Sequence, residues 1–265
     1  MKIEHAYILY IDDPVSVSYM EECVRSCEQY NIPWSTLQWF KPPVKTLDLL
    51  INYNLNLNPR LDHPDNIIHL KEAMCSTGHI NLWDRIYRMH KGAVAIFEHD
   101  AVVKRDIRSI DVEDNEIAFL GYRLDSSDDY ECVDDPFTKL PIKEFSGTHA
   151  YAITPNTAKY LYDTVKRKSF FSSLCENCQC DSQYLPICSV DWWLGHNMLG
   201  LKKLTIVDPC PVIAVVGGRK SFTQYYEQVA KFNAPSDNGL PEKFLQGIIN
   251  KNKYFVDDKN YLRFR

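Results

Sequence analysis

The 265-residue chain lacks the features that mark proteins outside the ordinary globular class. No stretch approaches the about 18 consecutive apolar residues that a membrane-spanning helix needs. The N-terminus lacks the long apolar segment and small-residue cleavage site of a secretory signal, so we expect a cytoplasmic location, the host cytoplasm if the protein is viral. Internal repeats and a Ser/Gly-rich linker are also missing. With 45% hydrophobic and 25% charged residues, the composition excludes disordered, collagen-like and disulfide-stapled miniprotein classes.

An excess of basic charge is absent as well. The formal net charge is −5 and the sequence pI is about 5.9, which excludes a uniform electrostatic grip on nucleic acid but leaves a local basic face open. One such segment is the C-terminal tail, residues 241–265, which has six Lys or Arg and three Asp or Glu with aromatic residues between them. This pattern is typical of a nucleic-acid face and equally of a solvated amphipathic end.

Cysteine is present in an odd number, nine, in a chain of medium length without a secretory signal. Reduced thiols are therefore the expected state. Four of them cluster in a cysteine-rich insertion, residues 170–188: Cys175, Cys178, Cys180 and Cys188. Four thiolates this close suit a structural Zn²⁺, although the usual pair of Cys-x2-Cys motifs is missing. The alternatives are free thiols in a loop and, in an oxidising compartment, disulfides.

Apolar runs alternate with segments of helical periodicity, which predicts an α/β fold with a sheet flanked by helices. We expect a single domain over residues 1–240, followed by the tail, with short helices among the final fifty residues. The region 69–90 predicts one helix or two joined near residues 76–78. The predicted strands are 7–11, 34–40, 93–97, 117–122, 149–153, 203–207 and 212–216, and the other predicted helices are 16–30, 155–168 and 190–199.

The most informative motif follows the strand predicted at residues 93–97. Five apolar residues end in Glu98-His99-Asp100, two carboxylates separated by one residue. In open α/β sheets, ligands bind at the carboxyl ends of the strands. Two acids there repel each other and lose hydration, and a hard divalent cation relieves both penalties. Such a cation can hold a diphosphate and stabilise it as a leaving group. The alternative is a solvated strand end.

The order of motifs over residues 70–200 resembles glycosyltransferase family 25, the lipopolysaccharide and collagen galactosyltransferase type. The matching segments include Gly78-His79-Ile80-Asn81-Leu82-Trp83, the strand ending in Glu98-His99-Asp100, Gly147-Thr148-His149-Ala150-Tyr151, and Val190-Asp191-Trp192-Trp193. In the family this strand ends in Glu-Asp-Asp, and here His99 stands in place of the middle acid. The resemblance implies a Rossmann-like, nucleotide-sugar-binding mixed sheet of the transferase A type, a divalent cation (Mn²⁺ or Mg²⁺), and inversion at the anomeric carbon.

Roles for individual residues follow from the motif and from this resemblance. An inverting transfer needs a base for the acceptor hydroxyl, and Asp191 is the expected base; its alternative is an acid favoured at a helix N-terminus. For each other residue the alternative is core packing or a plain surface position. The expected metal ligands are Glu98, Asp100 and His196. The expected donor-binding residues are Asp12, His79, Arg219 and Lys220. The expected acceptor-binding residues are His149, Tyr151 and Trp192.

The predicted function is a metal-dependent inverting glycosyltransferase that uses a nucleotide-diphosphate donor, UDP being the expected nucleotide. The acceptor hydroxyl belongs either to a hydroxymethylated base of phage DNA or to a surface glycan. One alternative is a non-catalytic binding module stapled by zinc. A further alternative is a nucleotide-sugar hydrolase or another metal-dependent phosphotransfer enzyme, which would act without an acceptor alcohol.

Overall fold

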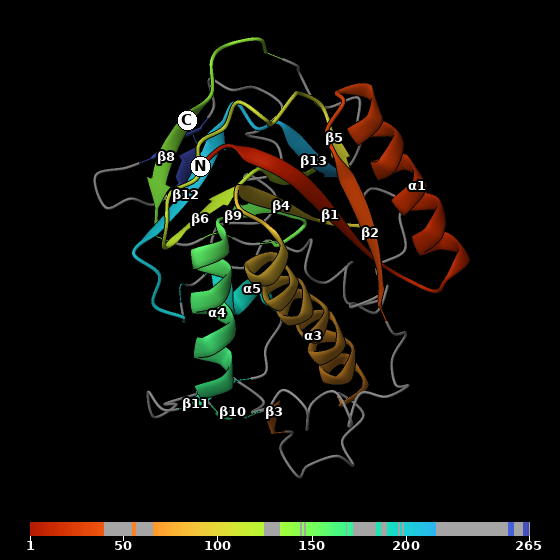
Figure 1. Ribbon diagram of the computed structural model, residues 1–265, viewed down its shortest axis with the longest axis vertical. Coiled ribbons are helices and arrows are strands. Elements are labelled where there is room, and N and C mark those ends of the chain that lie inside the picture. Colours follow the sequence, from red (N-terminus) through yellow and green to blue (C-terminus); the bar gives the residue numbers. More distant parts are fainter. Residues whose placement is uncertain are drawn as a thin grey trace.

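A seven-stranded mixed sheet with helices on both faces forms the centre of the molecule (Figure 1). The computed structural model describes residues 1–39, 55–56, 66–124, 133–143, 145, 147–167, 169–171, 184–186, 190–195, 197, 199–215, 254–256 and 262–264. The strand order is β2-β1-β4-β9-β6-β12-β8. These strands are β1 (Ile3–Ile11), β2 (Trp34–Trp39), β4 (Ala93–Glu98), β6 (Glu116–Phe119), β8 (Thr138–Ile142), β9 (Ala150–Ile153) and β12 (Lys203–Asp208).

The directions of the strands decide which strand ends lie next to one another in this sheet. β1 runs parallel to both β2 and β4, and β12 runs parallel to β6. β9 is antiparallel to both of its neighbours, β4 and β6, and β8 is antiparallel to β12. The start of β9 therefore lies beside the end of β4. The α/β class predicted from the sequence is confirmed.

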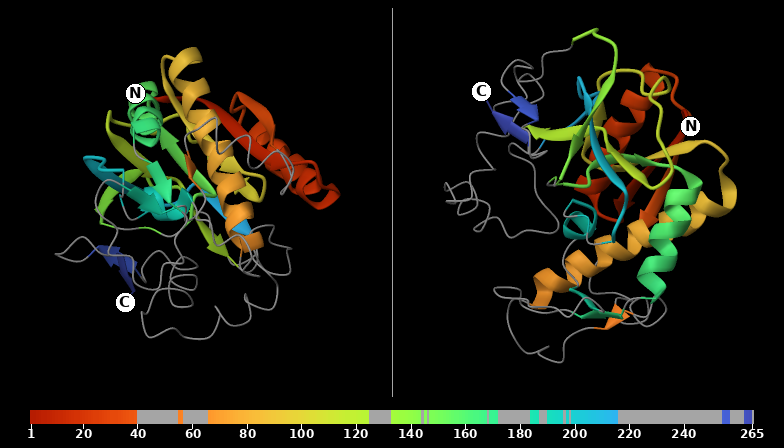
Figure 2. Two further views of the ribbon diagram at one scale, coloured as in Figure 1. Left: turned by 90° about the horizontal axis from the view of Figure 1, so that it is seen from below. Right: turned by 90° about the vertical axis from the view of Figure 1, so that its left-hand side faces the viewer.

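The helices divide between the two faces of this sheet. α3 (Asn66–Met89), α4 (Pro155–Arg167) and α5 (Val190–Gly195) contribute to one core, whereas α1 (Pro14–Gln29) contributes to the other. Figure 1 and both views of Figure 2 show α1 on the opposite side of the sheet from α3 and α4. Side chains of β4 alternate between these cores: Val94 and Ile96 face α3, and Ala95 and Phe97 face α1.

Individual residues explain where α1 begins and why α3 continues through Gly78. Asp13 precedes α1 and its side chain accepts a hydrogen bond of 3.0 Å from the Val15 amide, with Pro14 in the first helical position. The region predicted as one helix or two is a single helix, α3. Gly78 does not break it. A Cβ atom there would lie 3.1 Å from the Leu9 side chain, so glycine lets α3 approach β1 closely.

Other strands form smaller sheets. β5 (Ala101–Val103), β13 (Val212–Val215) and β7 (Gly121–Leu124) make one sheet of order β5-β13-β7. β11 (Tyr184–Pro186), β10 (Ser169–Phe171) and β3 (Leu55–Asn56) make another, and β14 (Tyr254–Val256) pairs with β15 (Leu262–Phe264). In the described part of the chain, no helix combines the length and hydropathy needed to cross a membrane.

Several predicted elements differ from the observed ones. The strand predicted at 117–122 is two strands, β6 and β7, which belong to different sheets because the chain passes from one to the other at Leu120. The helix predicted at 190–199 ends at Gly195, and Asn197 and Gly200 then adopt positive φ angles of 53° and 73°. The described segments of the tail are strands, not the short helices expected there.

Candidate functional site

The candidate site lies where β4 ends in the acidic motif. β4 is buried along its length until Glu98, whose side chain is 21% exposed. Leu9 of β1 pairs with Glu98, so the carboxyl ends of these two parallel strands share one edge of the sheet. Residues just before β9 reach the same edge, because the Glu98 amide donates a hydrogen bond of 2.9 Å to the carbonyl oxygen of His149. This edge is the usual ligand-binding position of an α/β sheet.

Two carboxylates from distant parts of the sequence meet at one hydroxyl group here. Thr148 Oγ1 donates a hydrogen bond of 2.8 Å to Glu98 Oε1 and also lies in short hydrogen-bond contact with Asp191 Oδ1. Thr148 itself is fully buried. A threonine hydroxyl has a single hydrogen and can donate to only one acceptor at a time. The arrangement therefore suits an additional proton or a cation between the carboxylates.

The short helix α5 places Asp191 in this arrangement. Asp191 lies in its first turn, beside the fully buried Val190. Gly195 ends the helix against the segment that precedes β9: its carbonyl oxygen accepts a hydrogen bond of 2.9 Å from the Phe145 amide. A Cβ atom at this position would lie only 1.8 Å from the Phe145 carbonyl oxygen, so only glycine permits this approach.

A buried aromatic network supports Glu98 from the α3 side. His79 Nε2 lies 3.5 Å from Glu98 Oε1, and a hydrogen bond of 2.9 Å joins His79 Nδ1 to the Tyr151 hydroxyl. Trp83 Nε1 donates a hydrogen bond of 2.9 Å to the same hydroxyl oxygen. Burial raises the pKa of Tyr151 well above its usual value, although the Trp83 hydrogen bond opposes this and the Glu98 charge adds to it. Tyr151 therefore stays neutral and fixes the His79 ring.

Asp100 approaches the same strand end from the opposite face. Burial raises the pKa of the Cys23 thiol on α1, and contact with Cys27 and the nearby charge of Asp100 add to this effect. Asp100 Oδ1 is a buried oxygen without a hydrogen-bond partner among the described residues. A single cation held by both Glu98 and Asp100 therefore stays a prediction, because Asp100 acts on the α1 side and Glu98 faces His79 on the α3 side. Carboxylate oxygens are the ligands that Mg²⁺ and Mn²⁺ prefer, and the Asp100 oxygen that lacks a hydrogen-bond partner among the described residues is chemically suited to such an ion.

The other predicted residues occupy varied positions. Asp12 is exposed and follows β1, at the same edge as Glu98. Trp192 lies in α5, but its side chain is outside the described part of the structure. Seven predicted site residues lie outside the described residues altogether: His196, Arg219, Lys220, Cys175, Cys178, Cys180 and Cys188.

Three roles expected for buried residues do not fit their positions. Tyr151 is fully buried and His149 is 1% exposed, so neither lies open to an acceptor as predicted. His79 was expected to bind the donor, yet it is also fully buried and contacts Glu98 instead. The physical reason is that β9 runs through the middle of the main sheet and is covered by α3. These residues support the site from within.

Sequence reasoning assigned no role to two residues of this cluster, Thr148 and Cys75. Cys75 lies one helical turn before His79 on α3, and its Sγ, an His79 ring nitrogen and a Glu98 oxygen all lie within 4.8 Å of one another. The i, i+4 spacing of Cys75 and His79 was a usable signal, since it puts both on one helix face. Thr148 gave no such signal, because its position depends on the direction of β9.

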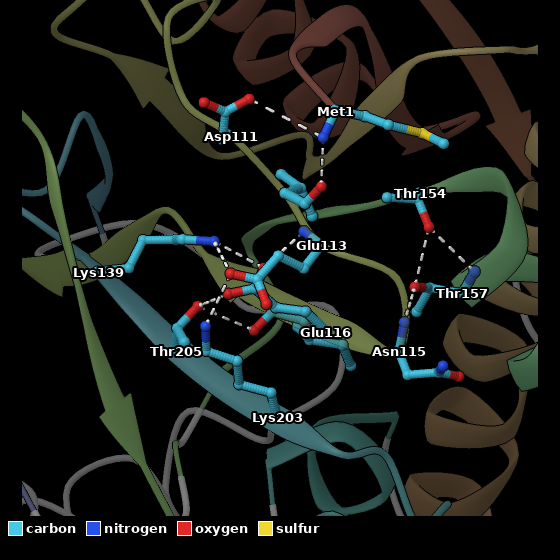
Figure 3. Close-up of polar contacts among 12 residues, drawn as sticks. Met1, Asp111, Glu113, Asn115, Glu116, Lys139, Thr154, Thr157, Lys203 and Thr205 are labelled. Atoms are coloured by element: carbon cyan, nitrogen blue, oxygen red, sulfur yellow. Dashed lines mark hydrogen bonds and ion pairs between the residues drawn. The ribbon is translucent and has the colours of Figure 1, made fainter.

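A fully buried carboxylate lies at the other end of the sheet, at the start of β6 (Figure 3). Glu116 is fully buried and accepts hydrogen bonds of 2.8 Å from Lys139 Nζ, 2.6 Å from Thr205 Oγ1 and 2.7 Å from the Glu113 amide. Lys203 Nζ reaches Glu113 at 3.0 Å on the exposed side. Every oxygen of Glu116 is engaged by a partner of this chain, so the cluster joins β6, β8 and β12 and serves a structural role.

A surface hollow of about 540 Å³ is lined by none of the candidate-site acids Glu98, Asp100 and Asp191. Its lining includes Tyr30, Arg105 and Phe137, and none of the predicted site residues. The Arg105 guanidinium stacks 4.2 Å from the Phe137 ring centroid. The candidate site therefore rests on the polar cluster at the end of β4, not on this hollow.

Compared with known protein families and with curated proteins, the chain matches none.

Proposed function

We propose that the protein is a metal-dependent glycosyltransferase that moves a sugar from a nucleotide-diphosphate donor to an acceptor hydroxyl. The observation that carries the proposal is the convergence of Glu98 and Asp191 on Thr148 at the carboxyl edge of a central strand. Two carboxylates at one site supply what such a transfer needs: one near the leaving group and one to take a proton. The mixed α/β sheet agrees with the transferase A type that the motif order resembles.

Asp191 is the base in this proposal. Its carboxylate accepts the proton of the acceptor hydroxyl as that oxygen attacks the anomeric carbon. Thr148 holds one carboxylate oxygen, which limits the rotation of the side chain and aims it at the site. Asp191 is also partly exposed, so an acceptor can reach it.

Glu98 and Asp100 supply carboxylate oxygens for a divalent cation at the sheet edge. When bound, this cation neutralises the charge that develops on the departing nucleotide diphosphate. Asp12 lies exposed after the neighbouring parallel strand, and in this proposal it contacts the donor. His79 and Tyr151 act indirectly by fixing Glu98.

The test begins with the donor. A panel of nucleotide sugars, with and without Mn²⁺, is measured by thermal shift, because a ligand that binds only the native state raises the melting temperature. The stabilising donor is then used in transfer assays with hydroxymethylcytosine DNA and with surface glycans. Asp191→Asn is expected to lower transfer by about 10²–10⁴-fold while leaving donor binding intact. The proposal fails if no nucleotide sugar binds, or if Asp191→Asn transfers at the wild-type rate.

A further inference from the structure

A cluster of possible metal ligands shares Glu98 with the proposed donor site, and glycosyl transfer gives its thiol no role. It comprises Cys75, His79 and Glu98, whose ligand atoms lie within 4.8 Å of one another. We propose that these three residues form a transition-metal site that binds Zn²⁺. The inference goes beyond the proposed function and does not depend on it.

The geometry of His79 carries the argument. His79 is fully buried, yet its Nε2 has no hydrogen-bond partner among the described residues and lies 3.5 Å from Glu98 Oε1. Two ligands on a tetrahedral zinc ion, each at about 2.1 Å, lie about 3.4 Å apart. The observed separation is therefore longer than a normal N–H···O hydrogen bond and matches a pair of ligands that share one ion.

The surroundings of the cluster fix both ligands, as metal sites in proteins require. The Tyr151 hydroxyl engages Nδ1 of His79, so that with the proton on Nδ1 the Nε2 lone pair faces Glu98. Thr148 holds the same oxygen of Glu98 that faces His79. In that tautomer the lone pair faces a carboxylate oxygen, and a cation between the two atoms turns this repulsive contact into an attractive one.

The chemical types of the three ligand atoms favour particular metals. Cys75 adds a thiol from the same face of α3, one turn before His79. A thiolate, an imidazole and a carboxylate together suit Zn²⁺ or Co²⁺, whereas Mg²⁺ and Mn²⁺ prefer oxygen ligands. Three protein ligands leave a fourth position open for water or for a small ligand, because Glu98 and Cys75 are only partly buried.

The test uses Co²⁺ as a spectroscopic probe on the full-length chain after removal of metals with a chelator. Wild-type protein is expected to bind one Co²⁺ at this site, with a thiolate-to-cobalt charge-transfer band and the visible bands of a tetrahedral ion, and Zn²⁺ is expected to displace it. Cys75→Ser should remove the part of the charge-transfer band that this site produces. Thr148→Val should weaken Co²⁺ binding by about 10–100-fold, because it leaves the ligands intact but frees Glu98.

The cysteine-rich insertion could produce a similar band, so a matched control is required. A Cys178→Ser/Cys180→Ser double variant should keep the band that Cys75→Ser loses, and circular dichroism establishes that each variant is folded. The inference is overturned if wild-type protein shows no thiolate band, or if the band depends only on Cys178 and Cys180. If Cys75→Ser does not fold, Glu98→Gln takes its place and must weaken Co²⁺ binding at least tenfold. Because the assay contains no nucleotide sugar, its failure is distinct from a failure of glycosyl transfer.

Discussion

Glu98 and Asp191 share one hydrogen-bond donor, the buried hydroxyl of Thr148. Glu98 ends a central strand and Asp191 lies in the first turn of a short helix far along the chain, so only the fold brings them together. Two acids beside a single donor form an arrangement that favours a bound cation or an extra proton.

Transferase activity is expected to depend on the hydroxyl group of Thr148 and not on the volume of its side chain. Thr148→Val keeps the shape of the side chain but leaves both carboxylates without this donor, and we expect transferase activity to fall by about 10–100-fold. Steady-state kinetics with the donor identified by thermal shift provides the measurement. Thr148→Ser restores a hydroxyl and should recover most of the activity. Equal activity of the Val and wild-type proteins would show that the bridge has no part in the reaction.

Asp100→Asn is expected to abolish Mn²⁺-stimulated transfer, because it removes a carboxylate from the expected cation site. The same change removes a negative charge near the buried Cys23 thiol, from a carboxylate whose Oδ1 has no hydrogen-bond partner in the described part of the chain. The melting temperature without metal should therefore stay the same or rise. Full activity in this variant would show that the metal assignment of Asp100 is wrong. A lowered melting temperature would show that the acid stabilises the fold instead.

Lys139 is expected to contribute far more to stability than Lys203, although both pair with acids in one cluster. Lys139→Ala leaves the fully buried carboxylate of Glu116 without its counter-charge, which we expect to lower the free energy of unfolding by about 3–5 kcal/mol. Lys203 pairs with the exposed Glu113, so Lys203→Ala should cost only about 0–1 kcal/mol. Urea denaturation followed by circular dichroism compares the two. Similar losses in both variants would contradict the structural role assigned to Glu116.

A low pH is expected to reduce the stability of the fold at the start of α4, because Asp114 becomes protonated there. Hydrogen bonds from Thr154 and Asn156 lower the pKa of Asp114 below its ordinary value. A carboxyl with a lowered pKa stabilises the fold above its unfolded-state pKa of about 3.9 and loses this contribution as pH falls further. The stability gap between wild type and Asp114→Asn should therefore be full at neutral pH and should close below about pH 4. Denaturation curves over this pH range test it, and a gap independent of pH would contradict it.

Much of the fold could be read from local patterns. The apolar run at Ala93–Phe97 predicted a buried central strand, and β4 lies third in the seven-stranded sheet with both faces covered. Strands of this kind are recognisable because burial on both faces leaves no alternation. β8 was not predicted, because apolar and polar residues alternate only weakly along it and Pro141 interrupts the pattern. Its place at the sheet edge, with burial on only part of its length, explains the missing signal.

The sequence by itself determined that an apolar strand ends in two acids, because periodicity is a property of neighbouring residues. It left open whether Cys75 and His79 lie on one helix, which the structure shows as α3. It did not determine which distant residues meet at that strand end. Only the tertiary structure decided this, since β9 is antiparallel to β4 and carries Thr148 to the end of β4. The same pairing buries Tyr151 and His149, which the sequence had suggested as acceptor-binding residues with core packing as the alternative. Strand direction is set by non-local hydrogen bonding, which no short window of residues encodes.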